Sequence, residues 1–215
     1  MFTSLTFSDQ AIILKRIDFD EAKRIVTMLT RGHGKVAAVA PGVRKVTSHK
    51  SQHLELFNYS RVFLARGKNL DIITEAETID SFDNIRDDLE KIGKAYYVVE
   101  LVDALLPEGQ KNYQVFKLTL TILQKLNQLS AATATKGSST LPKPTLKPKP
   151  TLKVGISGML RDFEVQLLEV LGFWSDEVHG KNYPTEPSAQ ARFNKLLIER
   201  IAERELRTPK IFESL

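Results

Sequence analysis

The sequence predicts an α+β protein in which a small five-stranded antiparallel barrel is followed by an all-α part. Short apolar and β-branched runs recur between Gly, Asp and Ser residues up to about residue 80, a pattern that is typical of strands. After Ser81 the apolar period changes from two to about 3.6, which is typical of amphipathic helices. We therefore expect a barrel domain over residues 1–80 and a helical domain over residues 81–215.

Five runs in the barrel region have the length and composition of strands. They cover residues 10–17, 24–30, 35–40, 54–65 and 71–78. A long basic loop, residues 41–53, separates the third run from the fourth. Closing five short strands into a barrel removes the exposed edges that a flat sheet would leave. On this pattern alone, an OB-fold and an SH3-like barrel both fit.

The helical region divides into four expected helices. The first has Asp83 as its N-cap and ends before Pro107, and the second covers residues 113–129. The stripe that the first would bury runs through Ile85, Leu89, Ile92, Tyr96 and Val99. A third helix begins at Ser157 and ends at Gly172, and a last one covers residues 188–206. Between the second and third, residues 130–153 are rich in Pro, Lys and Thr, so we expect a flexible, solvated segment there.

Composition narrows the possible chemistry. The chain has no cysteine, which excludes disulfides and thiolate-bound zinc, and its four histidines are scattered. Neither a Gly-rich phosphate loop nor a His-Glu-x-x-His motif occurs. We therefore expect a protein that is not an enzyme and that uses no cofactor or metal. With no secretory leader and no apolar run of about 18 residues, the expected location is cytoplasmic.

Positive charge is concentrated in the barrel region. The net charge is only +5, but residues 31–68 contain a single acid, Glu55, and many bases. These bases are Arg31, Lys35, Arg44, Lys45, Lys50, Arg61, Arg66 and Lys68. A basic surface on a barrel neutralises phosphates without reading sequence. The alternative interpretation is an ordinary solvated surface.

Two sets of side chains are candidate nucleic-acid contacts. The expected phosphate contacts are Lys35, Arg44, Lys45, Lys50, Arg66 and Lys68. Phe57, Tyr59 and Phe63 share one parity of the fourth run, so they would point to one side. They can serve as stacking platforms for bases or as ordinary core residues of the barrel.

Several segments resemble the bacterial recombination mediator family RecO. The similar segments are 11–16, 24–27, 34–36 and 41–45 in the barrel region, and 96–109 and 167–173 in the helical region. The most specific is 96–109, Tyr-Tyr-Val-Val-Glu-Leu-Val-Asp-Ala-Leu-Leu-Pro-Glu-Gly, which is similar to the first long helix of the family and its end. Many members carry a four-cysteine zinc site after the helix that here ends at Gly172, and this chain has none of those cysteines.

The resemblance implies an N-terminal OB-fold, a helical C-terminal domain and a role in DNA repair and homologous recombination. It implies binding of single- and double-stranded DNA, annealing of complementary strands without ATP, and a nucleoid-associated location. It also implies that RecR, single-strand-binding protein and, indirectly, RecA are partners. Competing interpretations are an OB-fold RNA- or ribosome-associated protein without annealing activity, a nuclease, and an interaction module whose helices bind a peptide.

Overall fold

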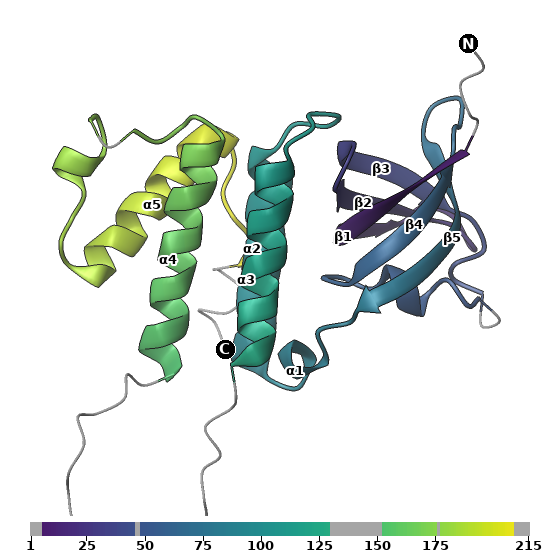
Figure 1. Cartoon of the computed structure of the whole chain (residues 1–215), viewed down its shortest axis with the longest axis horizontal. Helices are drawn as coiled ribbons and strands as arrows, with labels where there is room; N and C mark the ends of the chain where they lie inside the picture. Colours follow the sequence, from purple (N-terminus) through teal and green to yellow (C-terminus); the bar gives the residue numbers. More distant parts are fainter. Residues whose placement is uncertain (1–5, 46–47, 130–151, 176, 209–215) are drawn as a thin grey trace, which may run out of the picture.

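The structure is a computed structural model that describes residues 6–45, 48–129, 152–175 and 177–208. A closed barrel forms one half of the molecule and helices form the other, and α2 and α3 lie between the barrel and the last two helices (Figure 1). The barrel strands are β1 (Thr6–Asp18), β2 (Arg24–Thr30), β3 (Gly34–Ala40), β4 (Tyr59–Ala65) and β5 (Asp71–Asp80).

The strands close in the order β1-β2-β3-β5-β4, with β4 paired back to β1. The pairings are antiparallel except between β3 and β5, where Ala38 and Val39 lie opposite Asp71 and Ile72 in a parallel ladder. The expected five-stranded OB-fold barrel followed by helices is confirmed, with a mixed rather than a purely antiparallel sheet. The fourth expected run is shorter than predicted, because Gln52–Leu54 forms a 3-10 turn and β4 begins only at Tyr59.

Alternation along the strands gives the barrel two apolar faces. Ala11 and Ile13 of β1 point into the barrel interior, with Val26 and Met28 of β2 beside them. Ile12, Leu14 and Leu29 point outward and are buried in the same core as the helices. The outer wall of the barrel therefore forms part of the helical core, which fixes the position of the two halves relative to each other.

In the described part of the helical half, the elements are α1 (Asp83–Arg86), α2 (Leu89–Leu105), α3 (Tyr113–Gln128), α4 (Leu152–Val170), the 3-10 turn Gly180–Asn182 and α5 (Pro187–Ala202). The prediction of one helix from Asp83 was wrong, because the chain breaks between α1 and α2. The Asp88 carboxylate accepts hydrogen bonds from the main-chain nitrogens of Glu90 and Lys91, so Asp88 rather than Asp83 is the N-cap of the long helix.

The buried face of α2 matches the predicted stripe only in part: Val99 is buried, as is Ile85 before the break. Ala95, Val98 and Val102 are fully buried, whereas Leu89 of the predicted stripe is 64% exposed. The later elements follow the prediction more closely. α4 begins before Ser157 and is followed by Gly172 at φ +80°, as expected for a residue just past a helix end. Of the segment predicted to be flexible, residues 130–151 lie outside the described residues, and Leu152 and Lys153 belong to α4.

Candidate nucleic-acid interface

The three aromatic residues predicted to share one face lie in three different environments. Phe57 precedes β4 with a left-handed backbone (φ +70°) and is 3% exposed. Its ring meets Tyr96 of α2 edge-on at 4.9 Å, so Phe57 is a core residue between the barrel and the helices. The shared parity was wrong for Phe57, because parity holds only within a continuous strand.

Tyr59 and Phe63 do lie on the outer face of β4. The Tyr59 hydroxyl donates a 2.8 Å hydrogen bond to Gln10, and its ring packs beside Phe116 of α3. Burial raises the pKa of Tyr59, so its hydroxyl stays protonated and keeps donating. Phe63 is 37% exposed and lines a shallow hollow with Phe7 and with Thr6, Ser8, Thr74 and Glu75. Of the three aromatic residues, Phe63 is therefore the best placed for base stacking.

Lys35 lies away from solvent. Its Nζ donates a 2.7 Å hydrogen bond to the main-chain oxygen of Asp103 and lies 3.4 Å from an oxygen of the Asp103 carboxylate. Next to it, the main-chain nitrogen of Gly109 donates to the main-chain oxygen of Lys35. Lys35 thus joins β3 to the end of α2, and its amine is not exposed for a phosphate.

Arg44 and Lys45 follow β3 on the surface. The Arg44 guanidinium donates to the main-chain oxygen of Asp20 at 2.7 Å and lies 3.5 Å from Asp18. A hydrogen bond from Arg24, together with the charges nearby, lowers the pKa of Asp18 despite some desolvation, so Asp18 remains ionised and offsets part of this charge. Lys45 is exposed, and its amine has no partner among the described residues.

The other three predicted bases, Lys50, Arg66 and Lys68, also differ in how exposed they are and in which groups they contact. Lys50 is partly buried and its Nζ donates to the main-chain oxygen of Ile73, and burial lowers its pKa. Arg66 lies 4.4 Å from the centre of the Phe7 ring and 2.9 Å from Asp71. Lys68 is exposed, with no side-chain partner in the described part of the chain.

The structure does not bring the six bases into one stripe. Arg66 and Lys68 belong to the β4–β5 turn, where Arg66 lies beside Phe7 and Asp71. Arg44, by contrast, contacts Asp18 and Asp20 at the β1–β2 turn. Lys35 is on a third side, against α2. The exposed members of these six bases therefore lie in two separate places on the barrel.

A basic and aromatic cluster that the sequence did not reveal lies where the barrel meets α3. The Arg31 guanidinium lies 5.5 Å from the centre of the Tyr113 ring, which is 53% exposed, and donates to Gln10. Arg61 lies opposite Gln10 in the β1–β4 ladder. Arg31 and Arg61 belong to the basic span seen in the sequence, but Tyr113 is brought to them only by the tertiary fold.

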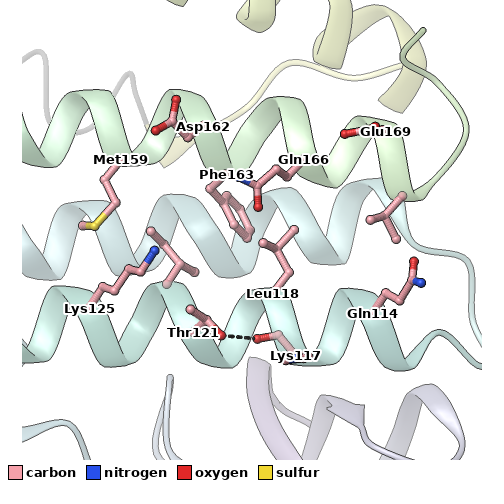
Figure 2. A pocket seen from close by; sticks show the side chains of 12 residues that line it. Gln114, Lys117, Leu118, Thr121, Lys125, Met159, Asp162, Phe163, Gln166 and Glu169 are labelled. Atoms are coloured by element: carbon pink, nitrogen blue, oxygen red, sulfur yellow. Dashed lines mark hydrogen bonds between the residues drawn. The ribbon is translucent and has the colours of Figure 1, made fainter.

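The helical half contains an open groove between α3 and α4, with a volume of about 710 Å³. Figure 2 shows Phe163 of α4 and Leu118 of α3 in the middle of this groove, with Lys125 and Met159 toward one end and Gln114 and Glu169 toward the other. An apolar floor with charged walls is typical of surfaces that bind peptides.

Two further properties concern the described residues only. No group of three or more His, Asp or Glu side chains there is arranged to hold a metal ion. Among the described residues, no helix is long and apolar enough to cross a membrane.

The sequence is similar to known proteins over both the barrel and the first helices. Residues 2–82 match the family model described as Recombination protein O N terminal, and residues 86–135 match Recombination protein O C terminal. Proteins named DNA repair protein RecO are 37% identical over 167 residues in Roseiflexus sp. (78% of this chain and 50% of the relative) and 42% identical over 120 residues in Pelotomaculum thermopropionicum (56% and 47%). In Dehalococcoides mccartyi (strain ATCC BAA-2266) a third is 43% identical over 126 residues (59% and 50%).

The chain spans about half the length of the curated relatives it matches. The two family models lie on the barrel and on the first helices in the same order as in the structure. On this evidence of sequence and fold together, the chain belongs to the RecO family.

Proposed function

We propose that this chain acts in DNA repair and homologous recombination as a mediator rather than as an enzyme. In this role it binds single- and double-stranded DNA, anneals complementary strands without ATP, and works with RecR to help load RecA onto DNA coated with single-strand-binding protein. The proposal rests on the membership of a family whose relatives are named DNA repair proteins. The observation that carries the binding step is the exposed basic surface of the barrel, at Arg44, Lys45, Arg66 and Lys68.

The physical basis of this binding is charge. Exposed lysines and arginines release counterions from the DNA backbone, so the binding is independent of sequence and weakens as salt rises. Lys45 and Lys68 contribute most per residue, because no described carboxylate pairs with their amines. The ion pairs of Arg44 with Asp18 and of Arg66 with Asp71 are exposed and exchange readily for phosphates.

The groove between α3 and α4 supports the partner-binding part of the proposal. Its apolar floor, with Leu118 and Phe163, lies on the helical half, away from the exposed bases of the barrel. A protein partner bound there would leave the barrel surface accessible to DNA. We propose that this groove contributes to binding one of the protein partners.

The experiment that tests the proposal measures annealing of two complementary oligonucleotides coated with single-strand-binding protein, by fluorescence, without ATP and at two salt concentrations. We expect acceleration that fades with salt and is lost in the double variant Arg44→Glu/Lys45→Glu. The matched control is Lys181→Glu/Arg192→Glu, which makes the same charge change at exposed positions of the helical half.

Other outcomes would contradict the proposal. No acceleration at either salt concentration, with tighter binding to structured RNA than to single-stranded DNA, would favour an RNA-binding protein. Cleavage of labelled oligonucleotides in the presence of Mg²⁺ would show an enzyme. Equal losses in both double variants would show that net charge, rather than the barrel surface, controls annealing.

A further inference from the structure

Four neighbouring strands place apolar β-branched residues at positions that pair with one another in register. Ile17 of β1 lies opposite Ile25 of β2, Ile25 lies opposite Val39 of β3, and Val39 lies opposite Ile72 of β5. The register therefore forms one continuous row of four aliphatic side chains across the sheet, which we call the aliphatic row.

The aliphatic row faces outward. Val26 and Ala38, which alternate with these residues, point into the barrel interior. Ile17 is 46% exposed and Ile72 is 38% exposed, and Ile25 and Val39 are partly exposed. Leu14 of β1 and Leu29 of β2 are buried in the core shared with the helices, but no described element buries the row.

The apolar surface continues beyond the row. Phe19, two residues after Ile17 in the β1–β2 turn, is 62% exposed. Single exposed apolar residues are normal on a protein surface, but contiguous ones rimmed by polar groups mark interaction sites. Four β-branched residues in register on adjacent strands, with an exposed phenylalanine at one end, form such a contiguous surface.

The surrounding charges indicate the kind of partner. Acids near the row are already paired with bases: Asp18 with Arg24 and Arg44, Asp20 with Lys23, and Asp71 with Arg66. Glu21 is an exposed acid in the β1–β2 turn. Because two arginines share Asp18, and because further lysines lack partners, the rim has a surplus of positive charge.

Three lysines make up most of this surplus. Lys15 lies two residues before Ile17 on the same face of β1, since it pairs with Thr27, the outward neighbour of Ile25. Lys45 follows β3, and Lys68 follows Gly67, where a Cβ would lie 3.7 Å from Ile72. All three are exposed, and their amines have no partner among the described residues.

We propose that the aliphatic row is a docking surface for an acidic amphipathic protein segment, whose aliphatic side chains cover the row while its carboxylates pair with Lys15, Lys45 and Lys68. A second copy of this chain is a poorer occupant, because its lysines would meet those of the first copy. DNA is a poorer occupant of the row itself, because its four aliphatic side chains give bases no aromatic ring for stacking. Lys45 and Lys68 on the rim also serve the proposed DNA contacts, whereas Lys15 belongs to this proposal alone. This proposal goes beyond nucleic-acid binding and does not depend on it.

The test is a selection of random peptides displayed on phage, first for binding to the full chain and then against binding to Ile17→Thr/Ile72→Thr. Threonine keeps the β-branched shape, so the strands are maintained while apolar surface is lost. The matched control is Ile79→Thr, which changes an isoleucine with 45% exposure on the same strand as Ile72, seven positions away from it. Thermal unfolding followed by circular dichroism checks that each variant is folded.

We expect the enriched peptides to combine aliphatic residues with Asp and Glu. Their affinity should fall at least about tenfold in Ile17→Thr/Ile72→Thr and several-fold in Lys15→Glu. It should not change in Ile79→Thr or in Lys181→Glu, a charge reversal on the helical half. Binding of single-stranded DNA should be the same in the parent and in Ile17→Thr/Ile72→Thr, which separates this proposal from the proposed function.

Four outcomes would overturn the proposal. One is that no peptide depends on the row, and another is that the enriched peptides are basic. Self-association of the parent that disappears in Ile17→Thr/Ile72→Thr, measured by sedimentation velocity, would assign the face to a second copy. A loss of DNA affinity in that variant, with folding intact, would assign it to nucleic acid.

Discussion

The Nζ atom of Lys35 lies 2.7 Å from the main-chain oxygen of Asp103 and 3.4 Å from its carboxylate, and these contacts join the barrel to α2. Arg204, which follows α5, lies 3.6 Å from the other carboxylate oxygen of Asp103. Asp103 thus connects three parts of the chain: β3, α2 and the segment after α5. The basic span of residues 31–68 therefore includes one lysine, Lys35, whose role is structural.

Replacing Lys35 with Met should lower stability and leave DNA affinity unchanged. The substitution removes a buried, charged hydrogen-bond donor, and such a loss costs about 1.5–3 kcal/mol. Urea unfolding of the full chain measures the cost, and fluorescence anisotropy with a single-stranded oligonucleotide measures the affinity. Lys68→Met is the matched control, because Lys68 is exposed and its loss should change stability by less than about 0.5 kcal/mol. Weaker DNA binding by Lys35→Met at unchanged stability would show that this account of Lys35 is wrong.

Phe63→Ala should weaken binding of single-stranded DNA with little effect on folding. The Phe63 ring is 37% exposed on the outer face of β4. A base stacked on it contributes about 1–3 kcal/mol to binding. Phe63→Tyr keeps the aromatic face and should bind like the parent, which a titration followed by anisotropy can check. If Phe63→Tyr and Phe63→Ala lose affinity equally, stacking is not the contribution that Phe63 makes.

How much of the fold the sequence predicts depends on the range of the interactions involved. The barrel strands were predicted because alternation of apolar residues is a local signal, and β2 was predicted with its observed bounds. The break before α2 was missed, although Asp88 is a good capping residue, because apolar residues continue at helical spacing from Ile85 across the break. A short break in a helix is hard to predict from apolar spacing when that spacing continues across it.

The candidate site was less predictable, because it depends on contacts between distant residues. Lys35 and Asp103 are 68 positions apart, and nothing in the local sequence marks Lys35 as buried. Phe57 was expected on the same face as Phe63, but its left-handed backbone turns it into the core beside Tyr96. Charge patterning correctly indicates a basic barrel surface, but it does not show which amines are already paired.

Lys45→Ala and Lys68→Ala should each reduce the salt dependence of DNA binding. Each exposed amine that contacts a phosphate contributes about 0.7 to the log–log slope for single strands. Affinities at four or more salt concentrations give the slope for the parent and for each variant. Lys35→Met should keep the parent slope, and Lys50→Ala should lose less than Lys45→Ala, because the Lys50 amine already donates to Ile73. A full loss in Lys50→Ala would show that the loop rearranges when DNA binds.

Glu164 of α4 is buried where α2, α4 and α5 meet. Its carboxylate accepts a 2.7 Å hydrogen bond from the Tyr97 hydroxyl of α2 and another of 2.7 Å from the Asn194 amide of α5. Burial raises the pKa of Glu164 above its usual value, although both hydrogen bonds and nearby positive charges act in the opposite direction. Burial and the adjacent Glu164 also raise the pKa of Tyr97, so Tyr97 remains a donor.

The raised pKa predicts how stability varies with pH. Between the unfolded pKa, near 4.5, and the higher folded pKa, the folded state holds the Glu164 proton more tightly than the unfolded state. The contribution of Glu164 to stability is therefore fully present below the unfolded pKa and is lost as pH rises through the folded pKa. Glu164→Gln has no titrating proton at this position. In the described structure Asn194 Oδ1 has no hydrogen-bond partner, and if the Asn194 amide rotates, this oxygen can accept a hydrogen bond from the new glutamine amide. We expect the variant to gain stability relative to the parent as pH rises from about 4.5 to 8.

Urea unfolding of the parent and Glu164→Gln at several pH values measures this difference. Glu169→Gln is the control, because Glu169 is exposed on the same helix and should give a curve parallel to that of the parent. Parallel curves for Glu164→Gln and the parent would mean that Glu164 titrates alike in the folded and unfolded chain. A parent that instead gains stability over the variant as pH rises would mean that the Tyr97 and Asn194 hydrogen bonds outweigh desolvation, because they favour the ionised carboxylate.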